Sequence, residues 1–262
     1  MQEVFIVSMA RTPIGALSST LSGLNVIELG KTVVKAAMER AGVNGDQIDE
    51  VYLGNVLQAN VGQAPAQQVS IAAGINTKTP CTTINKVCAS GMKAIMLGAQ
   101  SIMLGDNHIV VVGGMESMSN APHYLPSGRT GIRYGNGEIL DAISRDGLQD
   151  PYKKYMMGNA GEVCAKHYSF TREDQDAYAI ASYKRAQDAY ANGYFKDEII
   201  PVVIASRKGD ITISEDEEYK KFDEAKVSAL KPAFEKEGTI TAINASKIND
   251  GASAMVLMSG DK

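Results

Sequence analysis

The sequence predicts an α/β protein: a mostly parallel five-stranded sheet with helices on both faces. Short apolar runs, typical of buried strands, alternate with segments of helical apolar spacing up to Gly114. Such alternation favours parallel strands covered by helices on both sides. In addition, 44% of the 262 residues are hydrophobic, so the chain can bury a large core and is not expected to be disordered.

The expected elements follow in order along the chain. Helical spacing over residues 26–41 and 64–73 predicts two helices, which Gly42 and Gly74 end, and a third helix follows over residues 92–104. The apolar runs expected to form the five strands are residues 4–7, 51–57, 82–84, 108–114 and 254–258.

The middle of the chain differs in composition from the rest and predicts an inserted domain. From about residue 118 to 243 it is polar and rich in turns, and it includes a Lys/Glu-rich stretch at 207–237. One clear helix opens at Thr171, where Asp174 completes a capping box, and ends at Gly193. We therefore predict a first domain made of residues 1–117 and 247–262, interrupted by an α+β loop domain at 118–246.

Composition argues against several classes of partner. A net charge of −4 is unsuited to a nucleic-acid surface. No run of eighteen apolar residues appears, so we expect no membrane span. The first residues lack the pattern of a secretory signal, and three cysteines fit free thiols in a reducing compartment. We expect a cytoplasmic protein.

Cys88 is the candidate nucleophile. It lies among small residues between the β-branched run at 82–84 and the helix expected after it, which places the thiol at a turn. Helix N–H groups and the helix dipole favour the thiolate, which is the reactive form of cysteine. The alternative is a buried structural thiol, the commoner fate of a free cysteine.

Several motifs then resemble one family, the thiolases, and among them the acetyl-CoA acetyltransferases. Residues 85–94, Asn-Lys-Val-Cys-Ala-Ser-Gly-Met-Lys-Ala, resemble the thiolase nucleophile segment. The match covers essentially the whole chain in the expected order. The other matching segments are residues 10–15, 113–119, 156–158, 244–246 and 249–252, of which the last three bound the CoA-binding loop domain of thiolases.

The resemblance implies a thiolase-type layered fold and a two-step acyl transfer. Cys88 would take the acetyl group of one acetyl-CoA as a thioester, and the carbanion of a second acetyl-CoA would attack it, giving acetoacetyl-CoA and CoA. The backbone N–H of Cys88 would help to stabilise the oxyanion. The resemblance implies coenzyme A thioesters as substrates, no permanently bound cofactor, and a homo-oligomer, dimer or tetramer when complete.

Further residues are candidates for substrate binding. By resemblance, Met157 lines the short acyl pocket and Ser246 contacts the pantetheine arm; core packing and a turn or cap are their structural alternatives. Met156 stands where many biosynthetic members carry histidine. Lys220 and Lys221 are candidate partners for the CoA phosphates, although their stretch also carries Asp and Glu and reads as an ordinary solvated face.

Other interpretations remain open. One is a 3-ketoacyl-CoA thiolase of longer chain length, and another is a non-catalytic CoA-binding or assembly module. Complete thiolases, by this resemblance, also carry a Gly-His-Pro motif, an Asn-Glu segment and a Cys-x-Gly motif. None of the three occurs in this sequence. We therefore expect this chain alone not to be fully active. Cys164 and His167 are too few ligands for a metal site, and we expect none.

Overall fold

The computed structural model describes residues 1–207 and 209–262; Lys208, in the Lys/Glu-rich stretch, lies outside the described residues. The chain forms two compact units. The first consists of Met1–Pro122, Glu198–Asp216 and Asn249–Lys262, and the second of His123–Asp197 and Glu217–Ile248.

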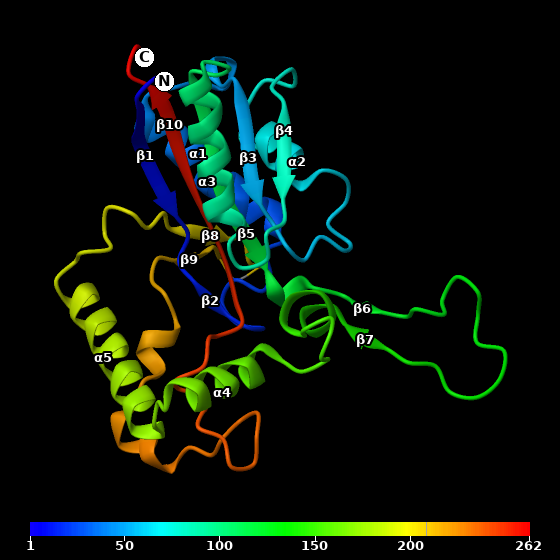
Figure 1. Ribbon diagram of the computed structural model, residues 1–262. Coiled ribbons are helices and arrows are strands. Elements are labelled where there is room, and N and C mark those ends of the chain that lie inside the picture. Colours follow the sequence, from blue (N-terminus) through cyan, green and yellow to red (C-terminus); the bar gives the residue numbers. More distant parts are fainter. Residues whose placement is uncertain (208) are drawn as a thin grey trace. The chain divides into compact units, whose positions relative to one another are not determined.

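The first unit is built on one sheet, in the order β1-β10-β5-β3-β4 (Figure 1). β3 pairs in parallel with both β4 and β5, whereas β10 is antiparallel to β1 and to β5. The sheet is therefore mixed, with β10 running against its neighbours. Its strands are β1 (Val4–Arg11), β3 (Glu50–Gly54), β4 (Cys81–Ile84), β5 (Ile109–Ser117) and β10 (Asn249–Ser259), with the short β2 (Gly15–Ala16) paired to β10.

Helices cover both faces of this sheet, which confirms the predicted α/β class. α1 (Val26–Ala41) packs against β1 and β10, and α3 (Ser90–Leu104) packs against β5 and β3 (Figure 1). Successive side chains of β5 point to opposite faces of the sheet. Val111 joins the larger core beneath α1 and α2 (Pro65–Ala72), whereas Val110 and Val112 pack with Ile102 of α3.

The bounds of α1 agree with the prediction because both ends carry capping signals. The side chain of Asn25 accepts hydrogen bonds from Ile27 N and Glu28 N, and the carboxylate of Glu28 accepts one from Asn25 N. At the other end Gly42 has φ 69°, the left-handed conformation that glycine adopts without strain.

β5 and β10 are longer than predicted, because residues that resemble a loop in sequence continue both strands. β5 extends through Gly113 and Gly114 to Ser117. A Cβ on Gly113 would lie 2.2 Å from the backbone oxygen of Ser253 on β10. Close approach of the two backbones therefore requires glycine here, and the strand continues without an apolar side chain at this position.

One apolar stretch differs from our expectation of no membrane-length segment. Val87–Leu104 has a mean hydropathy of 1.4 and is long and apolar enough to cross a membrane by length and composition alone. This is weak evidence, since core helices of soluble proteins pass the same test. In the first unit α3 packs Ala94 and Ile102 into the sheet.

The segment Glu198–Asp216 belongs to the first unit, although we placed it in the inserted domain. It contains the paired strands β8 (Val202–Ile204) and β9 (Ile211–Ile213). Arg11 holds both of its ends, with Nε 2.6 Å from Glu198 and Nη1 2.8 Å from Asp216. The compact units thus divide the chain at residues other than the predicted limits, 117–118 and 246–247.

The second unit contains a short strand pair and two longer helices. Thr171 caps the second of them, α5 (Arg172–Ala191), as the sequence predicted, accepting a hydrogen bond from Asp174 N at 3.1 Å. The strands are β6 (His123–Tyr124) and β7 (Leu140–Asp141), and the helices are α4 (Met157–Tyr168) and α5 (Arg172–Ala191). Short turns of 3-10 or π helix in the two units lie at Gly45–Gln47, Met118–Asn120, Ile143–Leu148, Glu218–Lys221 and Glu224–Ala229.

Candidate functional site

Cys88 lies at the predicted turn, between the end of β4 at Ile84 and the start of α3 at Ser90. Its side chain is exposed and its thiol is free. The structure therefore presents the thiol to solvent at the carboxyl end of a parallel strand, where α/β proteins commonly place reacting groups. A buried structural thiol, the alternative interpretation of the sequence, does not describe this residue.

The turn that carries Cys88 is strained and heavily hydrogen bonded. Val87 has φ 50°, which is costly for a β-branched residue. Val87 N donates to Asn85 Oδ1 at 2.9 Å, and Lys86 N donates to Ser90 Oγ at 2.8 Å. Ser90 N and Ser90 Oγ both donate to the Val87 carbonyl, at 3.0 and 2.5 Å. The conformation of the turn is thus fixed by its own polar groups.

A half-buried carboxylate beside the same strand ends was missed from the sequence. Glu116 on β5 accepts hydrogen bonds from Asn55 Nδ2 at 2.8 Å and from Val56 N and Leu57 N at 2.9 and 3.1 Å. Burial raises the pKa of Glu116, although these donors oppose the shift. Asn55 is 1% exposed. Each residue follows an apolar run in the sequence, but nothing near either one indicates that the two pair.

The other two cysteines have different environments. Cys81 is half-buried on β4 and packs against the core of the first unit; its thiol donates to the Thr79 carbonyl at 3.3 Å. Burial raises the pKa of Cys81, which disfavours its thiolate. Cys164 lies exposed on α4 in the second unit.

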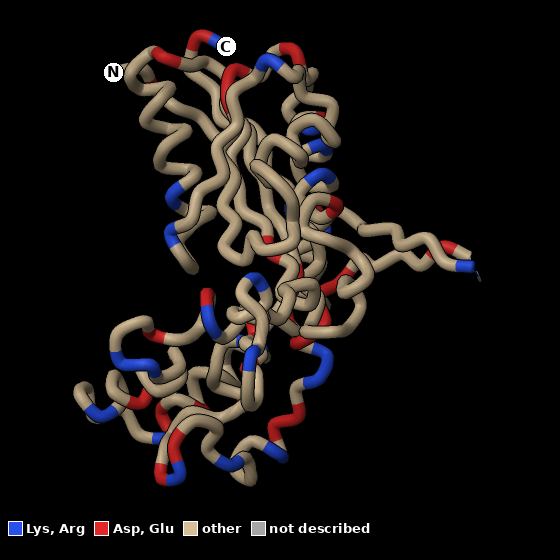
Figure 2. The backbone as a smooth tube through the Cα atoms, turned by 90° about the vertical axis from the view of Figure 1, so that its right-hand side faces the viewer, with Lys and Arg blue, Asp and Glu red and all other residues tan. Residues whose placement is uncertain are grey.

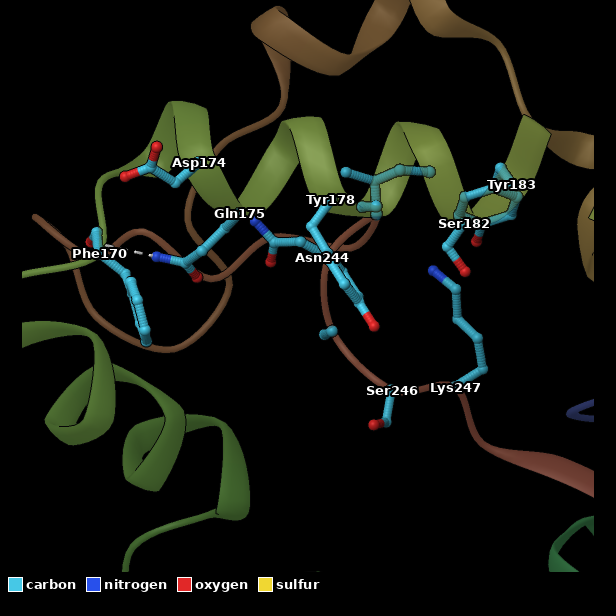
Figure 3. Close-up of a pocket in the computed structure, with 12 residues that line it drawn as sticks. Phe170, Asp174, Gln175, Tyr178, Ser182, Tyr183, Asn244, Ser246 and Lys247 are labelled. Atoms are coloured by element: carbon cyan, nitrogen blue, oxygen red, sulfur yellow. Dashed lines mark hydrogen bonds between the residues drawn. The ribbon is translucent and has the colours of Figure 1, made fainter. Parts of the chain in front are cut away.

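The second unit holds a cavity of about 590 Å³ between α5 and the segment that contains Ser246 (Figure 3). Tyr178 and Tyr183 of α5 line it opposite Asn244 and Ser246. Its wall combines aromatic rings with amide, hydroxyl and ammonium groups, a mixture typical of small-molecule sites. Sequence reasoning identified Ser246 but not the tyrosines, because nothing in the spacing of α5 pairs them with residues more than sixty positions away.

Lys247 also lines this cavity and was not singled out in the sequence. Its ammonium donates to the carbonyl of Ala242, so the side chain folds back over its own loop. Burial lowers the pKa of Lys247, Glu218 opposes this shift, and the positive charge of Lys221 adds to it.

The remaining predicted binding residues lie elsewhere in the second unit. Met157 is the first residue of α4 and is 44% exposed; it is not among the residues that line the cavity. Lys221 forms ion pairs with Glu218 at 3.1 Å and Glu217 at 3.9 Å, and Lys220 lies over the ring of Tyr219 at 5.8 Å. Lys and Arg are interspersed with Asp and Glu through this unit, so its charges are mixed (Figure 2).

Cys164 and His167 both lie on α4, and the His167 ring contacts that of Tyr168 at 4.7 Å between centroids. Among the described residues, no three His, Cys, Asp or Glu side chains come together as metal ligands would.

Comparison with known proteins identifies the family. A family model described as "Thiolase, N-terminal domain" matches residues 4–261. The acetyl-CoA acetyltransferase of Schizosaccharomyces pombe is 50% identical over 262 residues, which cover 99% of this chain and 66% of that protein. A mitochondrial acetyl-CoA acetyltransferase of Xenopus tropicalis is 53% identical, with 98% and 61% covered. The chain thus spans about two thirds of the length of these relatives.

A solved structure supports the same conclusion. The Acat5 thiolase of Ascaris suum, determined in complex with coenzyme A, matches with a TM-score of 0.93 and 49% identity. The alignment covers 99% of this chain and 66% of that one. The resemblance and the layered fold predicted from the sequence are both confirmed. The chain therefore belongs to the thiolase N-terminal domain family.

Proposed function

We propose that this chain supplies the acyl-accepting half-reaction of an acetyl-CoA C-acetyltransferase, with Cys88 as the nucleophile. The observation that carries the proposal is the exposed thiol on a hydrogen-bonded turn between β4 and α3. The names of relatives at about half identity support a short acyl chain over a longer one.

The proposed step balances in atoms and charge. The Cys88 thiolate attacks the thioester carbonyl of acetyl-CoA, and a new C–S bond forms as the carbonyl oxygen becomes an oxyanion. The backbone N–H of Cys88 is the proposed donor to that oxyanion. Collapse of the intermediate breaks the original C–S bond and the CoA thiolate leaves; it takes up from solvent a proton equivalent to the one that the Cys88 thiol released, and acetyl-Cys88 remains.

In the complete reaction, the carbanion of a second acetyl-CoA would attack acetyl-Cys88 and give acetoacetyl-CoA. By the family resemblance, a histidine motif would activate the nucleophile, an Asn-Glu segment would help to position a catalytic water, and a second cysteine would remove the α-proton; none of these motifs is in the sequence. We therefore propose that the 262 residues alone do not sustain full turnover. A sensitive acetoacetyl-CoA thiolysis assay tests this, and turnover near that of an intact thiolase would contradict it.

We propose that the second unit binds the coenzyme A moiety of the substrate. Ser246 lines its cavity together with Tyr178 and Lys247, as a site for the pantetheine arm requires: polar contacts in a partly apolar wall (Figure 3). Met157 remains the candidate for the acyl pocket, and Lys220 and Lys221 for the phosphates. The solved relative binds coenzyme A, which supports this assignment.

We further propose that the chain acts within a homo-oligomer. In the first unit, Phe5, Ile6 and Met9 of β1 are each about half exposed to solvent. Met92 and Met96 of α3 are also exposed. Apolar groups gathered on regular elements favour burial against protein. A cytoplasmic location stays a prediction, and several relatives are described as mitochondrial.

Intact-mass measurement tests the acyl-transfer proposal. The chain is incubated with acetyl-CoA, and we expect an added mass of about 42 Da together with release of free CoA. The Cys88→Ala variant should show neither. CoA binding without any adduct would instead indicate a non-catalytic CoA-binding module.

A further inference from the structure

We propose that Ser90 is a positioning residue for Cys88, an inference that rests on the proposed function. The hydroxyl of Ser90 accepts a hydrogen bond from Lys86 N at 2.8 Å and donates one to the Val87 carbonyl at 2.5 Å. These two bonds, here called the Ser90 clamp, join the start of α3 to the residues just before the nucleophile. Ser90 is only 5% exposed, so water does not readily replace them.

The turn needs such a clamp because Val87 does not hold its conformation by packing. Its φ is 50°, in the left-handed region that β-branched residues avoid. The side chain is 51% exposed, so few neighbours fix it. Hydrogen bonds to the backbone around Val87 therefore keep the turn in place, and the direction in which Cys88 projects follows from that backbone.

The geometry separates this role from ordinary helix capping. Ala89 is the N-cap of α3 and makes no side-chain cap bond, while Ser90, the first helical residue, directs its hydroxyl back to the turn rather than to the helix. The end of β3 packs closely on the same point: a Cβ on Gly54 would lie 2.7 Å from Ser90 Cβ. A bulkier residue at position 90 would meet this strand.

The same helix offers a matched control. Ser101 is also a buried serine of α3, 8% exposed, and its hydroxyl donates to the Gly98 carbonyl at 2.9 Å, within the helix. Ser101→Ala therefore removes one buried hydroxyl and its hydrogen bond from α3 without touching the turn that carries Cys88. The other two cysteines serve as internal references in the same molecule.

The test is timed alkylation by iodoacetamide of the full chain and its Ser90→Ala and Ser101→Ala variants, with each cysteine quantified by peptide mass spectrometry. We expect Ser90→Ala to lower the Cys88 rate, relative to Cys164, at least fivefold, and Ser101→Ala to leave it within twofold. A Cys88 rate in Ser90→Ala within twofold of the unmodified chain would overturn the proposal. Faster labelling of Cys81 in Ser90→Ala, together with the changed rate at Cys88, would also overturn the proposal, since it would show a general loosening of the sheet.

A second measurement does not depend on the variant folding. In the unmodified chain, hydrogen exchange at the Lys86 amide should be slow, because that N–H is held by Ser90; exchange at the rate of an unprotected amide would contradict the clamp. Alkylation by iodoacetamide needs no CoA, so the clamp and the proposed function can fail separately. If Ser90→Ala leaves alkylation of Cys88 unchanged while acetyl-Cys88 still forms in the unmodified chain, only the clamp is rejected. If Ser90→Ala slows alkylation as expected but the unmodified chain forms no acetyl-Cys88, only the proposed function is rejected.

Discussion

The carboxylate of Glu116 accepts a hydrogen bond from the side-chain amide of Asn55 at 2.8 Å, joining the carboxyl ends of β5 and β3. The same carboxylate accepts from Val56 N and Leu57 N, so it fixes the chain that leaves β3. β4, which leads to Cys88, pairs with β3 on the side away from β5. The pair therefore supports the sheet edge from which the Cys88 turn begins.

Replacing Glu116 should destabilise the first unit. In Glu116→Gln one side-chain oxygen becomes an NH₂ group, which cannot accept a hydrogen bond, so the variant loses either the bond from Val56 N or the two from Asn55 Nδ2 and Leu57 N. We expect a loss of about 2 kcal/mol in the free energy of unfolding. Denaturant unfolding followed by circular dichroism measures it.

Glu50→Gln is the matched control for that variant. Glu50 lies on the same sheet and accepts a hydrogen bond from Asn107 Nδ2 at 2.7 Å, which the amide oxygen of glutamine can also accept. We expect a loss below about 1 kcal/mol. Equal effects of the two variants would show that the Asn55–Glu116 pair has no special structural role.

Glu162 should make the second unit sensitive to acid. Burial alone would raise the pKa of Glu162, but hydrogen bonds from Ile240 N and from Thr239 N and Oγ1 outweigh it and lower the pKa below the ordinary 4.5. The folded state then binds this proton less readily than the unfolded state. The stabilisation that ionised Glu162 gives to the folded state is complete above pH 4.5. It is lost as the pH falls through the lowered pKa of Glu162.

Thermal unfolding across this pH range measures the effect. Glu162→Gln should be less stable than the unmodified chain near neutral pH, and the difference should shrink as the medium becomes acidic. Glu173→Gln, an exposed carboxylate on α5, should show almost no difference at any pH. A gap between Glu162→Gln and the unmodified chain that stays constant with pH would reject the assigned ionisation.

Val87→Gly should not destabilise the first unit, although a valine to glycine change normally does. Left-handed backbone costs an L-residue roughly 1–2 kcal/mol, and glycine avoids that cost. The loss of chain entropy on fixing glycine offsets about 0.5–1 kcal/mol of the gain. We expect an unfolding free energy equal to, or up to about 1 kcal/mol above, that of the unmodified chain.

Val203→Gly supplies the comparison for this change. Val203 lies on β8 and is 57% exposed, close to the exposure of Val87, but it has extended strand backbone. Glycine there should cost about 1 kcal/mol. If chemical denaturation shows that both variants are equally destabilised, the left-handed backbone at Val87 does not carry the cost in free energy assigned to it.

These cases show which parts of the molecule the sequence could predict. α1 was predicted to the residue because its apolar spacing and its caps, Asn25 and Gly42, lie within one segment. The turn at Cys88 was also a local signal. β5 was ended at Gly114 because the pairing that continues it to Ser117 is made with β10, far along the chain.

The candidate site divides in the same way. The pairing of Asn55 with Glu116 joins residues 61 positions apart, and no pattern near either residue indicates it. The left-handed backbone of Val87 opposes local preference, so a sequence-based prediction would not place it. In the cavity, Ser246 was identified only by resemblance, whereas Tyr178 and Lys247 became visible once α5 and the loop at 242–247 were placed together.

Lys220 and Lys221 should contribute to CoA binding through charge alone. Replacing both with alanine is expected to weaken CoA binding roughly three- to tenfold at low salt, because each exposed cation contributes modestly. The difference from the unmodified chain should narrow as salt rises. Isothermal titration calorimetry at low and high salt measures it.

The control for this pair is Lys153→Ala with Lys154→Ala, another adjacent pair of exposed lysines in the second unit. It has the same change in net charge but lies elsewhere in the sequence. We expect its CoA affinity to stay close to that of the unmodified chain. Equal weakening by both double variants would attribute the effect to net charge and remove Lys220 and Lys221 from the binding site.

The most direct test of the whole account is the location of the acetyl group after incubation with acetyl-CoA. Peptide mass spectrometry resolves the three cysteines, of which Cys88 and Cys164 are both exposed. We predict an adduct of about 42 Da on the peptide containing Cys88, none on Cys81 or Cys164, and release of one CoA for each adduct. Acetylation of Cys164 at the rate of Cys88, or of neither residue, would contradict the assignment of Cys88 as the nucleophile.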